Sequence, residues 1–178
     1  MSKYEVMCQA AATARKNWYE YRDRAWGYIG TLLTGFYEYC DIPLDRITYL
    51  RWNEETGEGR RYTPADGNQD YTLPGAIVFD PSDDYWHIGL SIPLTPVGRY
   101  PQDRFGFVLC VREKDGAVYV RVFLKGQARQ INVEDPISRA TVYDEIVNHT
   151  IRFFRDTKKA EKEIGFAFDR SSEKQVSP

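Results

Sequence analysis

The residues best suited to chemistry in this sequence are three aspartates and a histidine that lie close together: Asp80, Asp83, Asp84 and His87. Carboxylates and an imidazole at this spacing can bind a divalent metal or work as an acid and base pair. Aspartate, proline and serine also favour turns, and the segment 80–83 has that composition. We favour a turn there, and a metal-dependent hydrolase is the alternative.

Other catalytic residue types are scarce. The chain has two histidines and three cysteines. Cys110 would need a base beside it to act as a nucleophile, although an opposite arginine could lower the pKa of its thiol. The segment Gly57-Glu58-Gly59 lacks the third glycine of a dinucleotide fingerprint and the lysine of a P-loop. We therefore predict no catalytic residue, no metal and no cofactor, and we expect a protein that is not an enzyme.

A second group of residues predicts binding. The pair Asp115-Gly116 is typical of a two-residue hairpin turn, which sets Arg112 opposite Tyr119 and Cys110 opposite Arg121. Arginine and tyrosine anchor protein interfaces, and they also stack on nucleotides and single strands. The predicted binding residues are Arg112, Tyr119, Arg121, Lys125 and His87, with Arg99 and Tyr100 from the long loop 93–102. The alternative is that the N-terminal helix covers this face of the sheet. The arginines of the face would then pair with Glu20 or Asp23 of the helix.

An antiparallel sheet would position these residues. Alternating apolar residues predict a β-meander of about five to seven strands within residues 46–133. Its segments are 47–52, 60–63, 76–79, 85–92 and the hairpin 104–125, with residues 64–75 as a loop. The hairpin turn pairs Val111 with Val120 and Leu109 with Val122, so the turn and the apolar pattern agree. Ile131 is expected on the same apolar face.

Helices are predicted at both ends of a single α+β domain, residues 1–168. Residues 1–40 open with the spacing of a capping box, Ser2 to Glu5. An apolar stripe follows at alternating steps of four and three. Its members are Met7, Ala11, Ala14, Trp18, Tyr21, Ala25, Tyr28 and Leu32. The second helix spans residues 138–163, and residues 169–178 form a frayed polar tail.

The N-terminal helix is longer than the domain. From residue 3 to residue 39 it would measure about 55 Å, whereas a domain of this size is about 35–40 Å across. The helix must therefore project, or break at Gly27, Gly30 or Gly35. A projecting helix would need a partner to cover Trp18 and Tyr21, and a homodimer is the simplest solution.

Bulk composition limits the function classes. The 178 residues carry a net charge of −2, which argues against a duplex-binding protein. We see no membrane span, no secretion signal and no CxxC pair, and we predict a cytoplasmic location. The leading prediction is a non-enzymatic binding or assembly protein that acts through another protein. The alternatives are a small-ligand or nucleotide-binding domain using the arginine and tyrosine face, and the hydrolase.

Overall fold

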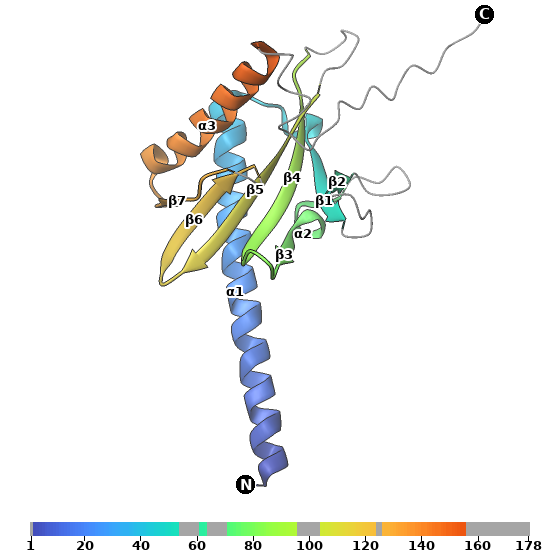
Figure 1. Ribbon diagram of the computed structural model, residues 1–178, viewed down its shortest axis with the longest axis vertical. Coiled ribbons are helices and arrows are strands. Elements are labelled where there is room, and N and C mark those ends of the chain that lie inside the picture. The colour runs from blue at the N-terminus through green and yellow to red at the C-terminus, as the bar shows by residue number, and fades with distance from the viewer. Residues whose placement is uncertain (1, 54–60, 64–70, 96–103, 124–125, 156–178) are drawn as a thin grey trace, which may run out of the picture.

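The fold is an antiparallel sheet with a helix from each end of the chain packed on one of its faces (Figure 1). The computed structural model describes residues 2–53, 61–63, 71–95, 104–123 and 126–155. The α+β class, the antiparallel sheet and the two terminal helices are thereby confirmed. Within the described residues, no helix combines the length and the apolar character that crossing a bilayer requires.

In the part of the chain that the structure describes, the sheet has seven strands, in the order β2-β1-β4-β5-β6-β7 with β3 also on β4. The strands are β1 (Thr48–Asn53), β2 (Arg61–Thr63), β3 (Val78–Asp80), β4 (Tyr85–Pro93), β5 (Arg104–Lys114), β6 (Ala117–Val122) and β7 (Arg129–Ile131). From β3 to β7, neighbours in the chain pair with each other, as a meander requires. The first strand departs from this order, because β1 pairs with one half of β4 while β3 pairs with the other half.

The β5–β6 hairpin has the predicted register. Lys114 pairs with Ala117, Val111 with Val120, and Leu109 with Val122. Gly116, in the turn, has φ +75°, a conformation that glycine adopts without strain. The turn and the hydrophobic pattern therefore specify the same pairing.

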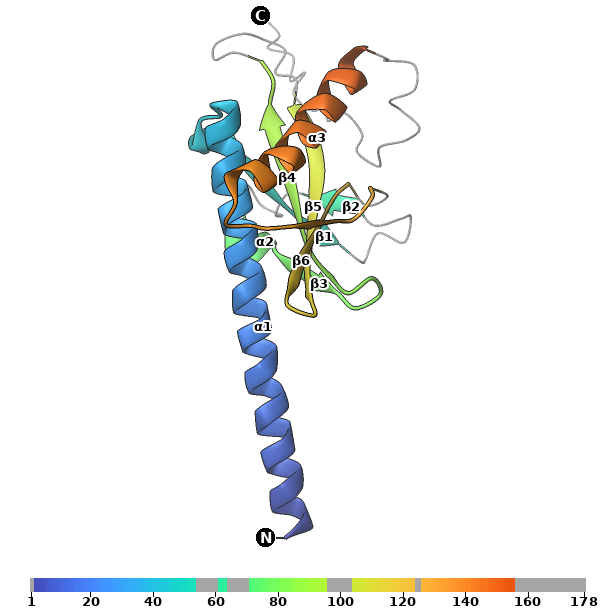
Figure 2. The same cartoon turned by 90° about the vertical axis from the view of Figure 1, so that its left-hand side faces the viewer.

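The N-terminal helix α1 (Lys3–Cys40) is unbroken and projects from the sheet (Figures 1 and 2). The predicted capping box is present, with Ser2 and Glu5 each accepting from the other's backbone N–H. Asp41 ends the helix in the left-handed conformation, with φ 53°. The buried residues of α1 are Ala25, Ile29, Leu32, Leu33, Phe36 and Tyr37, whereas all residues from 2 to 20 are exposed.

The core lies between the sheet and the two helices. It joins the buried face of α1 to inward residues of β4, β5 and β6, including Ile88, Phe107, Leu109 and Val120. The helix α3 (Pro136–Arg155) adds Val142, Tyr143 and Ile146. Ile131 joins the same core, as predicted, and so does Val133.

Two element boundaries differ from the predictions. The expected loop 64–75 and the start of the next strand contain a short helix, α2 (Leu73–Ala76), capped by Thr72. The C-terminal helix begins at Pro136 instead of residue 138, because the Asp135 carboxylate accepts from the first backbone N–H groups and proline suits the first helical position. The predicted end of that helix after residue 155 and the tail 169–178 lie outside the described residues.

Candidate functional site

The face of the sheet opposite the two helices carries most of the predicted site. Tyr85, Val108 and Cys110 are buried there, and Tyr119 packs against them. His87 and Cys110 are paired neighbours on β4 and β5, and both are completely buried. Alternation alone predicted a polar face, and it missed that the middle of these two strands is buried on both faces.

The segment between β3 and β4 is a turn, as favoured, and its aspartates shape it. The Asp80 carboxylate accepts a hydrogen bond from the Ser82 N–H at 2.9 Å, and the Asp83 carboxylate accepts from the Tyr85 N–H at 3.1 Å. Asp84 has φ 63°, which asparagine and aspartate tolerate better than most residues. The turn therefore aims the Asp83 side chain across the sheet face.

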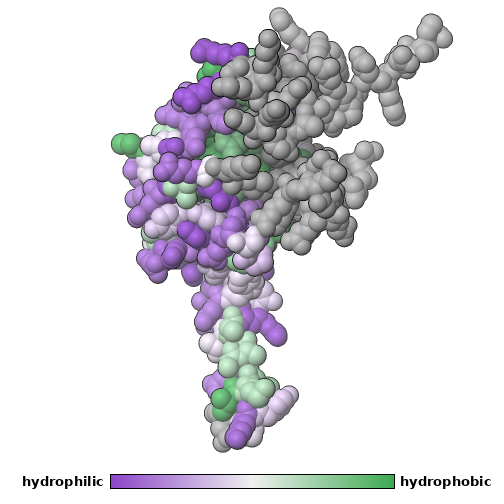
Figure 3. Space-filling model, viewed as in Figure 1, coloured by the Kyte–Doolittle hydropathy of each residue, from purple (hydrophilic) through white to green (hydrophobic). Residues whose placement is uncertain are grey.

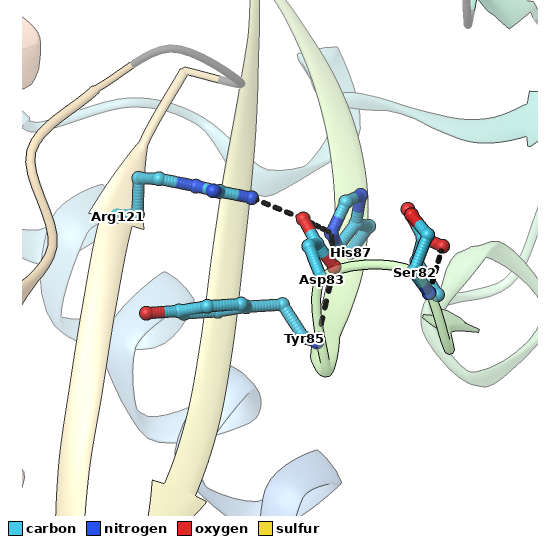
Figure 4. Close-up of polar contacts among 6 residues, drawn as sticks. Ser82, Asp83, Tyr85, His87 and Arg121 are labelled. Atoms are coloured by element: carbon cyan, nitrogen blue, oxygen red, sulfur yellow. Dashed lines mark hydrogen bonds and ion pairs between the residues drawn. The ribbon is translucent and has the colours of Figure 1, made fainter.

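Asp83 links β4 to β6 through two partners (Figure 4). The Arg121 Nη2 atom donates to Asp83 Oδ2 at 2.5 Å. The His87 Nε2 atom lies 3.0 Å from Asp83 Oδ2 and 3.1 Å from Oδ1. The side chains of Arg121 and Asp83 are 16% and 22% exposed, so this charged contact is mostly shielded from water.

Electrostatics fix the protonation of this cluster. Burial opposes the charged form of Asp83, yet the hydrogen bond from Arg121 and the nearby positive charge outweigh it, so the pKa of Asp83 lies below its usual value. Burial is also the main influence on His87, and it lowers the pKa of the imidazole despite the adjacent carboxylates. His87 is therefore neutral at pH 7. Because a carboxylate can only accept, the Nε2 atom of His87 carries the hydrogen.

Cys110 is not an activated nucleophile. Burial raises the pKa of its thiol to about 12, and the influence of Arg121 is too small to reverse this. The thiol is therefore protonated at neutral pH and is inert.

This cluster suits the ion pair between Arg121 and Asp83 better than it suits a bound metal ion. Asp80, Asp83 and His87 each offer a ligand atom within 4.8 Å of the others, and Asp84 does not belong to this set. However, Arg121 is bound to Asp83. At an effective dielectric constant of about 20, a guanidinium about 4 Å from a divalent ion would repel it by about 8 kcal/mol. The hydrolase alternative therefore gains no support from the geometry and stays a hypothesis.

The two arginines of this face differ in their surroundings. The Arg121 guanidinium lies 4.6 Å from the centre of the Tyr85 ring and is held by Asp83. The Arg112 guanidinium lies 4.5 Å from the Tyr85 ring and 5.5 Å from the Tyr119 ring. Its buried Nε atom has no acceptor, and no carboxylate of the described residues pairs with Arg112. Arg112 therefore keeps donors for a ligand, whereas Arg121 has an internal partner.

The predicted site residues are thus only partly brought together. Arg112, Tyr119, Arg121 and His87 lie on one face, whereas Lys125, Arg99 and Tyr100 lie outside the described residues. The sequence prediction missed Asp83 as the partner of Arg121 and Tyr85 as the ring shared by both arginines. Only the tertiary fold reveals the first contact, because its members are 38 positions apart.

The alternative in which α1 covers this face is wrong. The helix packs on the opposite face of the sheet. Its acidic residues pair elsewhere, Glu20 with Lys16 and Asp23 with Arg22. Arg24 of α1 instead reaches Glu113 of β5, with 2.8 Å between the charged atoms.

The projecting half of α1 is the second candidate surface. We call Tyr4, Met7, Ala11, Ala14 and Trp18 the α1 seam, because they recur at steps of three and four. Tyr4 is 74% exposed, Met7 69% and Trp18 41%. Figure 3 shows hydrophobic side chains along the far part of this helix.

Trp18 marks where the seam meets the sheet. Its ring centre lies 4.9 Å from that of Phe79 on β3 and 5.5 Å from that of Trp86 on β4. Tyr21 contacts the same two rings, at 6.3 and 6.0 Å. The seam is therefore continuous with the face of α1 that packs on the sheet.

No family model, no curated protein and no solved structure matches this chain.

Proposed function

We propose that this chain is a non-enzymatic assembly protein whose contact element is the projecting half of α1. The partner is a second copy of the chain, bound along the α1 seam. The observation that carries the proposal is the exposure of a regular apolar stripe on a helix that extends beyond its own core. Every residue from 2 to 20 is exposed, including Tyr4, Met7 and Trp18.

The spacing of the seam supports a helical partner. Apolar residues at alternating steps of three and four form a narrow stripe, which is the pattern that packs two helices against each other. A helix needed only to cover the sheet could start near Trp18. The chain instead continues the same stripe for four more turns, at 3.6 residues per turn. The capping box at Ser2 gives this extension a defined start.

Measuring the molar mass across a wide concentration range tests the proposal. The wild-type chain should rise from 20.7 kDa towards twice that value. Met7→Glu should remove the dimer. Full burial of a methionine contributes about 1.5–3 kcal/mol, and the substitution acts twice in a symmetric pair. The dissociation constant should therefore rise by about two to four orders of magnitude.

Val6→Glu is the matched control. Val6 is 52% exposed and adjacent to Met7, but it points about 100° away from the seam. This variant should dimerise as the wild type does. A wild-type mass that stays at 20.7 kDa at every concentration contradicts the proposal, and so does an equal effect of the two variants.

The polar sheet face supports a second candidate, a small-ligand or nucleotide-binding function. The observation in its favour is Arg112, whose guanidinium lies against two tyrosine rings and has no carboxylate partner among the described residues. A phosphate or carboxylate would fill its free donors, since arginine presents a planar fork that matches both groups.

A further inference from the structure

We infer that the two copies pair with their α1 helices antiparallel, so that each N-terminus reaches the sheet of the other copy. This inference rests on the proposed function, because it specifies how the second copy occupies the α1 seam. It follows from which side of the helix the sheet occupies, and from the sizes and charges of the seam residues.

The seam and the sheet lie on the same side of α1. At 3.6 residues per turn, the mean direction of the seam is within about 30° of the mean direction of the buried residues that follow. Trp18, the last seam residue, already touches Phe79 and Trp86 at the end of the sheet. Beyond Tyr21, where Ala25 is the first buried residue of α1, the chain's own sheet therefore fills the space beside the helix where a partner would continue.

This position of the sheet excludes a parallel pair. In a parallel pair the two seams face each other at the same level, so both sheets would lie between the two helices. The axes of two packed helices are only about 8–10 Å apart. A sheet packed on a helix needs a similar distance for itself, so two sheets do not fit between two packed helices. Two unbroken helices cannot meet at Trp18 and also enclose two sheets a turn later. Figure 2 shows that α1 runs straight past the sheet edge without the bend that would be needed.

An antiparallel pair has room for both sheets. They lie at opposite ends of the helix pair, and each sheet is in line with the N-terminus of the other copy. The contact is then limited to about the first 20 residues of each helix. The stretch of α1 in which every residue is exposed ends at residue 20, which matches the length of helix that this arrangement requires.

Side-chain sizes fit one antiparallel alignment. With the two-fold axis between residues 12 and 13, Ala11 of one copy faces Ala14 of the other. The small residues allow close approach at the centre. Met7 then faces Trp18, a favourable contact of sulfur with an aromatic ring. Tyr4 faces Tyr21 and extends the ring cluster that Tyr21 forms with Phe79 and Trp86.

The charges beside the seam agree with this alignment. The positions that flank the seam between Tyr4 and Trp18 hold Cys8, Ala10, Arg15 and Asn17. Arg15 of one copy lies nearest to Cys8 of the other, so no like charges face each other between Tyr4 and Trp18; Lys3, at the end of the contact, comes level with Arg22. The contact buries on the order of 1,000 Å² in total, near the lower limit for a specific interface, so dimerisation should depend on concentration.

Spin labels at two positions test the orientation. The labels are attached to Lys3→Cys and, separately, to Ala12→Cys, each in a Cys8→Ser, Cys40→Ser background. Cys110 is completely buried and stays unlabelled. At 1.5 Å per residue, the two copies of residue 3 are about 28 Å apart along the axis of the antiparallel pair, and those of residue 12 about 1.5 Å apart. Continuous-wave spectra report the short separation and pulsed spectra the long one.

The antiparallel pair predicts a long separation at residue 3 and a short one at residue 12. Short separations at both positions would show a parallel pair, and this result would overturn the inference while leaving the proposed assembly intact. A dimer by mass with long separations at both positions would place the contact elsewhere and overturn both proposals. A mass of 20.7 kDa throughout would overturn the assembly itself.

Discussion

Removing Arg121 tests the internal role of the polar sheet face. Arg121→Gln shortens the side chain and removes the charge that faces Asp83. Among the described residues, the carboxylate then keeps His87 and the backbone N–H of Tyr85 as partners. Asp83 stays mostly buried, at 22% exposed, so water can only partly replace the lost guanidinium.

The expected loss follows from this partial burial. Exposed ion pairs contribute about 0–1 kcal/mol, whereas breaking a fully buried pair costs about 3–5 kcal/mol. With Arg121 16% and Asp83 22% exposed, we expect an intermediate loss of about 2 kcal/mol. For a chain of this size, that loss lowers the melting temperature by about 4–8 °C.

A double-mutant cycle in urea isolates the pair. The cycle compares Arg121→Gln, Asp83→Asn and the double variant, and the coupling should be about 1–2 kcal/mol. Arg112→Gln is the matched control on the same face. It removes cation–π contacts but no ion pair, so its loss should be about 1 kcal/mol or less. Equal losses at the two arginines, or single effects that simply add, would show that the contact with Asp83 does not stabilise the fold.

Two further predictions concern protons and ligands. His87 has a lowered pKa in the folded state, so below about pH 6.5 the unfolded chain binds a proton more readily. Stability to urea should therefore fall as the pH drops below 6.5, by at most about 1.4 kcal/mol per pH unit. His87→Asn should flatten this region, and an unchanged profile in that variant would refute the assignment. If Arg112 binds phosphate groups, ATP at 100 times its dissociation constant should stabilise the wild type by about 2.7 kcal/mol, and Arg112→Gln should lose this effect. A wild-type melting temperature that ATP does not change would eliminate the nucleotide candidate.

Local signals made the hairpin predictable. The turn Asp115-Gly116 specifies the pairing by itself, and the alternation of apolar residues on both sides agrees with it. The capping box likewise specifies the start of α1. These features depend on residues within a few positions of one another, which is the range over which sequence patterns are informative.

The candidate site depended on contacts that no local pattern contains. Cys110 faces Arg121 as predicted, but the pKa of its thiol is raised because burial outweighs the arginine. The partner of Arg121 comes from the β3–β4 turn, which reaches β6 only when β4 and β5 have paired. The same holds for β1, which lies along the half of β4 that β3 leaves open.

The continuity of α1 follows from comparing two energies. Glycine in a helix interior costs about 1 kcal/mol, so Gly27, Gly30 and Gly35 together oppose the helix by about 3 kcal/mol. The helix also buries Ile29, Leu32, Leu33 and Phe36 on the sheet, and each such side chain contributes about 1.5–3 kcal/mol. Packing therefore outweighs the glycines. Gly35 also serves the packing of α1 on α3, since a Cβ there would collide with the Tyr143 hydroxyl. An unbroken helix that starts at residue 3 must then pass the edge of its sheet, and its exposed seam follows from the same packing that forms the core.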